Sequence, residues 1–183
     1  MKVLMARHGQ TDSNVEGRVM GQRLDDPLNE AGLQQARELG ESARSLALDV
    51  IFSSPLKRAH QTAEIVSHYC NAPIILRDEL KERDYGSLSG KTWKEIEAFT
   101  KTKPGELRAI DIDQKYDYRP YDGESAANVQ ERLLGCLSEI KNTYLGKQVL
   151  IITHRGILRM SHSLFYEMKI EDIKNAAIEE FDV

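Results

Sequence analysis

Val3-Leu4-Met5-Ala6-Arg7-His8-Gly9 passes from an apolar strand pattern into a polar loop. A second apolar run, Ile151-Ile152-Thr153-His154, also ends in a histidine. In an open α/β sheet, ligands bind in the crevice at the carboxyl ends of the strands, so two histidines that each end a strand are expected to meet in one pocket. The arginine directly before the first histidine indicates phosphate chemistry, because a planar guanidinium matches phosphate oxygens.

Strand and helix patterns alternate along the rest of the chain. Apolar runs predict strands at about residues 2–6, 50–52, 74–76 and 149–153, and the tail at 178–183 has the pattern of an edge strand. Helices are predicted at about residues 30–46, from Ser53-Ser54-Pro55 to about 69, and at 92–99, 125–144 and 156–166. Asn29 and the Ser53-Ser54 pair are the expected N-terminal caps.

This alternation predicts an α/β fold, built as a three-layer α/β/α sandwich around a mainly parallel sheet. The segment at residues 101–124 contains Pro104-Gly105 and Pro120 and lacks sustained periodicity. We therefore expect it to be irregular and to form a lid or insertion within a single domain that spans residues 1–183.

Composition narrows the classes of partner. The chain has 183 residues, of which 40% are apolar and 30% charged, and its net charge is −4. Without a concentrated basic face, neither nucleic acid nor a membrane is the expected main partner. Cys70 and Cys136 are far apart and lack metal-ligand spacing, which favours reduced thiols and no zinc site. No leader pattern and no long apolar run appears, so a cytoplasmic location is expected.

Three predicted strand ends collect the reactive side chains. The first delivers Arg7 and His8, the second delivers Ser53-Ser54 with Arg58 one turn into the next helix, and the last delivers His154. Arg7 and Arg58 could hold a phosphate while His8 attacks phosphorus, since neutral imidazole is a good nucleophile at physiological pH. A phosphoramidate on His8 would divide one hard hydrolysis into two displacements, without a metal ion.

Glu82 is the candidate general acid. It lies in the loop after residues 74–76, where a partly buried carboxyl beside a phosphate is expected to have a raised pKa. Such a group could protonate the leaving alkoxide and later deprotonate water.

Arg7-His8-Gly9-Gln10-Thr11-Asp12-Ser13-Asn14 resembles the RHGxTxxN signature of the histidine phosphatase superfamily. That family contains cofactor-dependent phosphoglycerate mutases, fructose-2,6-bisphosphatases and many small phosphatases. Further matches follow in the family's order along nearly the whole chain: Gly17-Arg18 to Gly21, Pro27-Leu28, Gly32 with Ala36, Ser53-Ser54-Pro55-Leu56-Lys57-Arg58-Ala59 with Gln61-Thr62-Ala63, Leu80-Lys81-Glu82 with Tyr85-Gly86 and Gly90, Gly123-Glu124-Ser125, and Thr153-His154.

The resemblance implies roles for individual residues. By similarity His8 becomes phosphorylated and Glu82 donates the proton. The residues that hold the phosphoryl group are then Arg7, Arg58, Asn14 and His154. The resemblance also implies a phosphoglycerate mutase-like sandwich, a small phosphate ester as substrate, and no metal or other cofactor.

Two departures from the family pattern bear on the substrate. Mutases typically carry a longer lid with paired arginines and a lysine placed for a substrate carboxylate, whereas residues 101–124 hold only the separated Arg108 and Arg119, and Gly90 is followed by Lys91-Thr92-Trp93. This departure favours net hydrolysis. Arg155 stands where many relatives have a small residue, and we hypothesise that it reaches the pocket rim and favours a substrate with a second anionic group.

Other basic residues have ordinary structural explanations. Solvation or packing accounts for His60, His68 and His162, and a solvated helix surface accounts for Lys57, Arg132 and Arg159. Four further residues are candidates for the pocket rim, although purely structural residues would show the same pattern: Gln10, Met20, Gly21 and Tyr85.

Three functions fit these residues. The leading prediction is a metal-independent phosphomonoesterase that acts on a small phosphorylated metabolite through a phosphohistidine on His8. A mutase or phosphotransferase would share the first half-reaction and return the phosphoryl group to an organic acceptor. A non-enzymatic, phospho-ligand-binding regulator would be expected to have lost His8 or Glu82, and both are present. An exposed edge strand could also support a homodimer.

Overall fold

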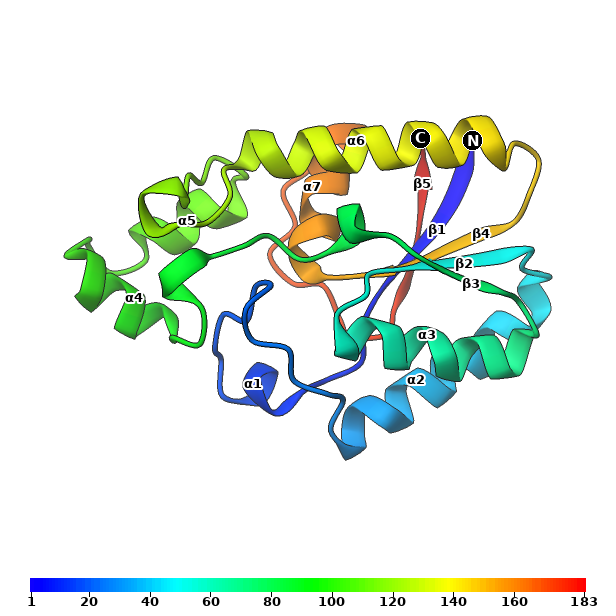
Figure 1. The fold of residues 1–183 in the computed structure, drawn as a ribbon. Helices are drawn as coiled ribbons and strands as arrows, with labels where there is room; N and C mark the ends of the chain where they lie inside the picture. Colours follow the sequence, from blue (N-terminus) through cyan, green and yellow to red (C-terminus); the bar gives the residue numbers. More distant parts are fainter.

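Five strands form one sheet in the computed structural model, which describes residues 1–183 (Figure 1). The strands are β1 (Lys2–Arg7), β2 (Val50–Ser53), β3 (Ile74–Leu76), β4 (Val149–Thr153) and β5 (Ile178–Asp182). Their order across the sheet is β3-β2-β4-β1-β5, in which only β5 runs antiparallel to its neighbour. The mainly parallel sheet and the edge strand at the tail are therefore confirmed.

Helices cover both faces of this sheet (Figure 1). α2 (Glu30–Ala43) and α3 (Lys57–Cys70) pack on one face, and α6 (Ala126–Thr143) and α7 (Arg155–Tyr166) pack on the other. Alternate strand residues enter separate cores, since side chains in a strand point to opposite faces. Met5 and Ile151 belong to the core beneath α6 and α7, whereas Ala6 and Ile152 belong to the core beneath α2 and α3. The three-layer α/β/α sandwich is confirmed.

The N-terminal caps follow the prediction only in part. The side chain of Asn29 caps α2 by accepting a hydrogen bond from the N–H of Gly32 at 2.9 Å. α3 begins at Lys57, its N-cap residue is Leu56, and the carboxylate of Asp25 accepts from the N–H of Lys57 at 2.7 Å. The predicted Ser53-Ser54 cap is wrong, because the Ser53 hydroxyl donates to the Ser54 carbonyl, and the Ser54 hydroxyl contacts His154 and accepts only from the N–H of Leu56, before the helix.

The segment expected to be irregular contains a helix. α5 (Glu106–Ile112) begins directly after Gly105, whose φ of +79° favours glycine. It follows α4 (Trp93–Thr100), and both helices lie at the left in Figure 1, away from the strands of the sheet. The remaining short elements are α1 (Asp12–Val15), η1 (Arg44–Leu46), η2 (Asp78–Leu80), η3 (Gly86–Leu88) and η4 (Arg119–Tyr121). None of the helices has the length and apolar character that crossing a membrane requires.

The segment before β5 fastens the carboxyl end of β1. The guanidinium of Arg7 donates to the carbonyl of Ile173 at 2.8 Å, and the N–H of Ala176 donates to the carbonyl of Arg7 at 2.9 Å. The side-chain amide of Asn175 donates to the carbonyl of His8 at 2.8 Å. Residues 173–176, which we call the C-terminal strap, thus fix the backbone on which the Arg7-His8 pair sits.

Candidate active site

Neighbouring parallel strands bring the two histidines together. The N–H of His8 donates to the carbonyl of Thr153 at 3.0 Å, which continues the pairing of β1 with β4 past the strand end. The rings of His8 and His154 lie 5.1 Å apart, centroid to centroid. The convergence that the sequence predicted is therefore present in the structure.

The ring of His8 is held in one tautomer. Its Nδ1 lies 2.6 Å from the carbonyl oxygen of Gly9, which can only accept, so Nδ1 carries the proton and Nε2 keeps its lone pair. Burial lowers the pKa of His8 well below its usual value, and the nearby charge of Arg58 acts in the same direction. The imidazole is consequently neutral at physiological pH, with a nucleophilic nitrogen available.

Two buried arginines flank this ring, and the carboxylate paired with Arg58, that of Asp25, is 3.8 Å away and partly exposed. Arg58 donates to the carbonyls of Gly21 at 2.8 Å and Leu24 at 3.1 Å, and Arg7 donates to a carbonyl of the C-terminal strap. Carbonyl groups orient a guanidinium but do not neutralise it. Burial lowers the pKa of Arg7 to about 9, which leaves it protonated at neutral pH. The pair therefore presents two positive charges where a phosphate would sit.

His154 lies behind this pair rather than on the pocket surface. It is fully buried, and its Nε2 lies 2.8 Å from the hydroxyl of Ser54. Its Nδ1 is also buried and has no partner. Burial lowers the pKa of His154 well below its usual value, so this ring is neutral as well. The Ser54 contact was not predicted, although the serine stands at the carboxyl end of a strand that neighbours β4.

Glu82 is placed at the start of α7. Its two carboxylate oxygens accept from the N–H of Arg83 at 2.9 Å and from the N–H of Gly156 at 3.0 Å. Burial pushes the pKa of Glu82 upward, but the charge of Arg83 and the two N–H donors outweigh it, and the pKa lies below its ordinary value. The raised pKa predicted for Glu82 beside a bound phosphate stays a prediction.

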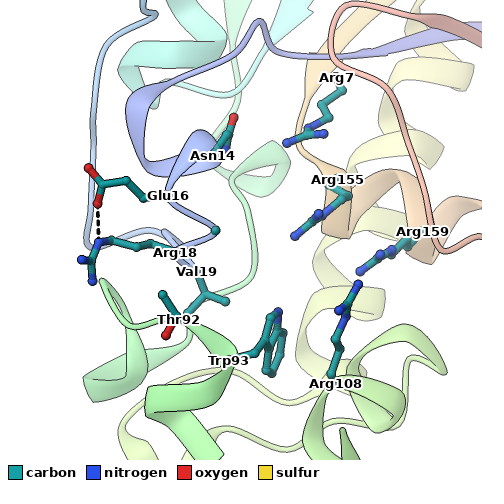
Figure 2. Close-up of a pocket in the computed structure, with 11 residues that line it drawn as sticks. Arg7, Asn14, Glu16, Arg18, Val19, Thr92, Trp93, Arg108, Arg155 and Arg159 are labelled. Carbon is teal, nitrogen blue, oxygen red and sulfur yellow. Dashed lines mark hydrogen bonds and ion pairs between the residues drawn. The ribbon is translucent and has the colours of Figure 1, made fainter.

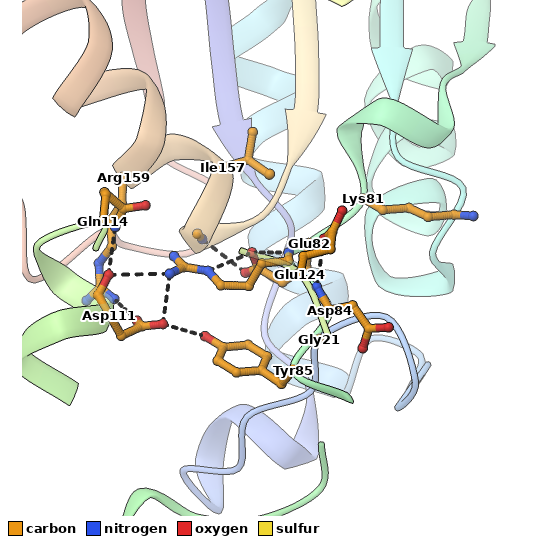
Figure 3. Close-up of polar contacts among 12 residues, drawn as sticks. Gly21, Lys81, Glu82, Asp84, Tyr85, Asp111, Gln114, Glu124, Ile157 and Arg159 are labelled. Atoms are coloured by element: carbon orange, nitrogen blue, oxygen red, sulfur yellow. Dashed lines mark hydrogen bonds and ion pairs between the residues drawn. The ribbon is translucent and has the colours of Figure 1, made fainter. Parts of the chain in front are cut away.

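A buried network of polar side chains, which was not predicted from the sequence, lies beside the carboxylate of Glu82. The side chains of Arg83 and Asp111 are each 1% exposed, and the guanidinium donates to the carboxylate at 2.8 Å. Tyr85 and Arg159 reach the same carboxylate from either side (Figure 3). Because Arg83 neighbours Glu82 in sequence and in space, Asp111 of α5 helps to place the charge beside the candidate acid.

Most of the predicted rim residues line the pocket. Its inner part has room for about 30 Å³ and is bordered by Arg7, His8, Asn14, Arg18, Val19, Met20, Gly21, Arg58, Glu82, Tyr85 and Arg155. Gln10 does not line it. The side-chain oxygen of Gln10 instead accepts a hydrogen bond from the side chain of Asn29, and the backbone N–H of Gln10 donates to the side chain of Gln35. The loop after β1 is thus packed against the start of α2. The prediction of Gln10 as a rim residue is wrong.

Two arginines assigned to solvated helix surfaces have structural contacts instead. Arg132 donates to the carbonyls of Lys81 and Glu82 and pairs with Glu124 at 2.9 Å, so it clamps the loop that carries the candidate acid. Arg159 is 5% exposed and lines a wider outer cavity. By contrast, His60 pairs with Glu64 on the surface of α3, as its ordinary explanation implies.

The donor set of the pocket does not resemble a metal centre. No group of three or more histidine, cysteine, aspartate and glutamate side chains is placed to hold a metal ion. The positive charge in the pocket comes from arginine, and its arrangement is suited to an oxyanion with several oxygens.

Comparisons with known proteins agree with this geometry. The model of the histidine phosphatase superfamily (branch 1) matches residues 3–183. Over 166 residues the chain is 37% identical to the "uncharacterized phosphatase PhoE" of Bacillus subtilis, covering 91% of this chain and 76% of that protein. It is 36% identical to the "metal-independent phosphoserine phosphatase" of Arabidopsis thaliana, covering 86% of this chain and 66% of that protein. A "probable phosphoglycerate mutase GpmB" of Salmonella arizonae is also 36% identical, over 84% of this chain and 69% of that protein.

A solved structure of a phosphatase has the same fold. The mycobacterial glucosyl-3-phosphoglycerate phosphatase, in a complex with VO3, superimposes with a TM-score of 0.86 at 28% identity, covering 98% of this chain and 91% of that one. The family match spans nearly the whole sequence, and Arg7, His8 and Arg58 line one pocket, with the buried ring of His154 5.1 Å from that of His8. The chain belongs to the histidine phosphatase superfamily and is a phosphatase.

Proposed function

We propose that this phosphatase hydrolyses a small phosphate monoester in two steps, through a phosphohistidine on Nε2 of His8 and without a metal ion. The observation that carries the proposal is the fixed tautomer of His8, whose Nδ1 is bound to a carbonyl while the ring stays neutral. The name of the metal-independent phosphoserine phosphatase relative supports the absence of a metal.

In the first step the lone pair of His8 Nε2 forms a bond to phosphorus, and the ester P–O bond breaks. Arg7 and Arg58 hold the non-bridging oxygens, whose charge develops in the transition state. Glu82 gives a proton to the departing alkoxide. A bound phosphate adds negative charge beside Glu82 and so favours its protonated form, which reverses the lowered pKa of the free site.

In the second step Glu82, now a carboxylate, takes a proton from water, and the oxygen attacks phosphorus. The N–P bond breaks, the electron pair returns to His8, and inorganic phosphate leaves. The same carboxyl thus serves as acid and then as base. Glu82 takes up a proton when the substrate binds and returns it to solvent when phosphate leaves, so the enzyme ends in its starting state.

Phosphate release from aryl and alkyl monoesters in excess chelator tests the proposal. The wild type should release phosphate and form an acid-labile, alkali-stable phosphoprotein, whereas His8→Ala should do neither. His60→Ala replaces a histidine on the surface of α3 and is the matched control, with expected wild-type activity. Activity in His8→Ala, or dependence on added metal, would contradict the mechanism.

A mutase would transfer the same phosphoryl group to an organic acceptor. We expect water to be the main acceptor, and adding an alcohol or a hydroxy acid to the assay measures how the phosphoryl group is partitioned. Transfer to the organic acceptor in preference to water would overturn hydrolysis while leaving the phosphohistidine intact.

A further inference from the structure

The pocket widens into an outer cavity that is lined by more positive charge than one phosphate needs. This cavity has a volume of about 380 Å³, within the range of small-molecule sites, and shares Arg7, Asn14 and Arg155 with the inner part. Arg155, Arg159 and Arg108 continue one wall away from Arg7, and Trp93 faces them (Figure 2). The wall therefore leads from the reacting phosphate toward a second cationic region.

The arginines of this wall have few acidic partners. The Arg155 side chain makes no hydrogen bond or ion pair within the protein, although it borders both parts of the pocket. Arg159 reaches Asp111 at 3.4 Å, but Arg83 binds the same carboxylate more closely, at 2.8 Å. One buried carboxylate thus serves two guanidinium groups.

The remaining ion pairs are exposed or lie on the other wall. Arg108 pairs at 3.2 Å with Glu171, and both side chains are more than half exposed. Across the cavity Arg18 pairs with Glu16 at 2.6 Å, which balances that side. The excess of positive charge is therefore confined to one wall, in a chain whose net charge is −4.

Gathering like charges in a half-enclosed cavity costs electrostatic free energy unless an anion is bound between them. After burial itself, the charge of Arg155 is the largest influence that lowers the pKa of Arg7. An anion bound beside Arg155 would remove this repulsion, and guanidinium groups bind carboxylate and phosphate oxygens through paired hydrogen bonds.

We propose that Arg155, Arg159 and Arg108 form a second anion subsite, and that the preferred substrate is a phosphomonoester carrying another anionic group a few bonds from the ester oxygen. Trp93 would cover the apolar linker between the two groups. The inference rests on the proposed function, because it assigns the rest of the substrate once the scissile phosphate is beside His8. Carboxylate and phosphate share the chemistry that this subsite recognises.

Three esters with the same three-carbon chain distinguish a carboxylate from a phosphate as the second anion: propyl phosphate, the phosphate ester of 3-hydroxypropanoate, and the bisphosphate of 1,3-propanediol. We expect kcat/KM to be about ten- to a hundredfold higher for at least one of the two doubly anionic esters than for propyl phosphate. Preference for the carboxylate or for the second phosphate would identify the occupant. Equal kcat/KM values for all three esters would overturn the subsite.

Substitutions locate the effect. Arg108→Met should abolish most of this preference while leaving kcat/KM for propyl phosphate within about threefold, because Arg108 borders only the outer cavity. Arg155→Met should reduce the preference further. Arg119→Met, on an exposed arginine paired with Asp117, is the control and should change neither value. Equal losses on all esters in Arg108→Met would contradict the proposal, whereas absence of hydrolysis in the wild type would contradict the proposed function itself.

Discussion

Replacing Asp111 by alanine should lower the free energy of unfolding by about 3–5 kcal/mol, the usual cost of removing one member of a buried ion pair. The carboxylate is 1% exposed and accepts from Arg83 at 2.8 Å and from the hydroxyl of Tyr118 at 2.8 Å, with Arg159 at 3.4 Å. Its loss leaves the buried charge of Arg83 without its nearest carboxylate, since Glu82 lies farther away, at 3.7 Å. With a urea m-value of about 2 kcal/mol per molar, the midpoint of unfolding should fall by roughly 2 M.

Urea titration followed by circular dichroism measures this change. Glu171→Ala removes an acidic partner of an exposed arginine and is the control, with an expected loss of at most about 1 kcal/mol. The double variant Arg83→Met with Asp111→Leu should regain part of the stability, because the guanidinium of Arg83 is then no longer buried without Asp111. A loss below about 1 kcal/mol in Asp111→Ala, or a double variant that is no more stable, would refute the reasoning.

Three further predictions concern the packing and charge around the site. Gly32→Ala places a methyl carbon 2.0 Å from the backbone oxygen of Gln10, so both stability and kcat should fall. Gly135→Ala, on α6, meets no other atom and should stabilise the protein by about 0.5–1 kcal/mol. Thermal melts of the two variants compare these effects directly. Ser54→Ala leaves the ring of His154 without its partner and should cost about 1–3 kcal/mol by urea titration, a loss that Ser54→Thr should largely avoid. The pKa of His8 is lowered on folding, so the unfolded chain binds protons first as the pH falls below about 6.5, and stability should drop between pH 7 and 5. His8→Gln should flatten that slope by up to about 1.4 kcal/mol per pH unit, and an unchanged slope would count against a buried neutral histidine.

The strand ends could be predicted because their signals are local. The apolar runs of β1 and β4 are typical of buried parallel strands, and parallel strands place their carboxyl ends at the same end of the sheet. His8 and His154 consequently met where the pattern placed them. The Asn29 cap was readable for the same reason, since a capping side chain binds N–H groups only a few residues away.

Long-range polar pairs could not be predicted in the same way. Arg83 lies in a polar loop and Arg159 on a helix, and neither position distinguishes a solvated arginine from one that is buried against Asp111. The burial of Glu82 could be foreseen, but the charge of Arg83 beside it, which lowers the pKa of Glu82 in the protein alone, could not. α5 was not predicted because it has only seven residues, follows Pro104-Gly105 and fully buries one charged side chain, while Leu107 and Ile110 pack on the core only partly buried.

The C-terminal strap has a consequence for synthesis of the protein on the ribosome. Ile173, which accepts from the side chain of Arg7, follows that arginine by 166 residues, and Asn175, which donates to the backbone of His8, follows that histidine by 167. The pairing of β1 with β4 and β5 likewise joins opposite parts of the chain. A nascent chain still held in the exit tunnel therefore lacks a complete pocket, and a ribosome-bound chain should acquire phosphatase activity only when a linker after β5 lets the strap emerge.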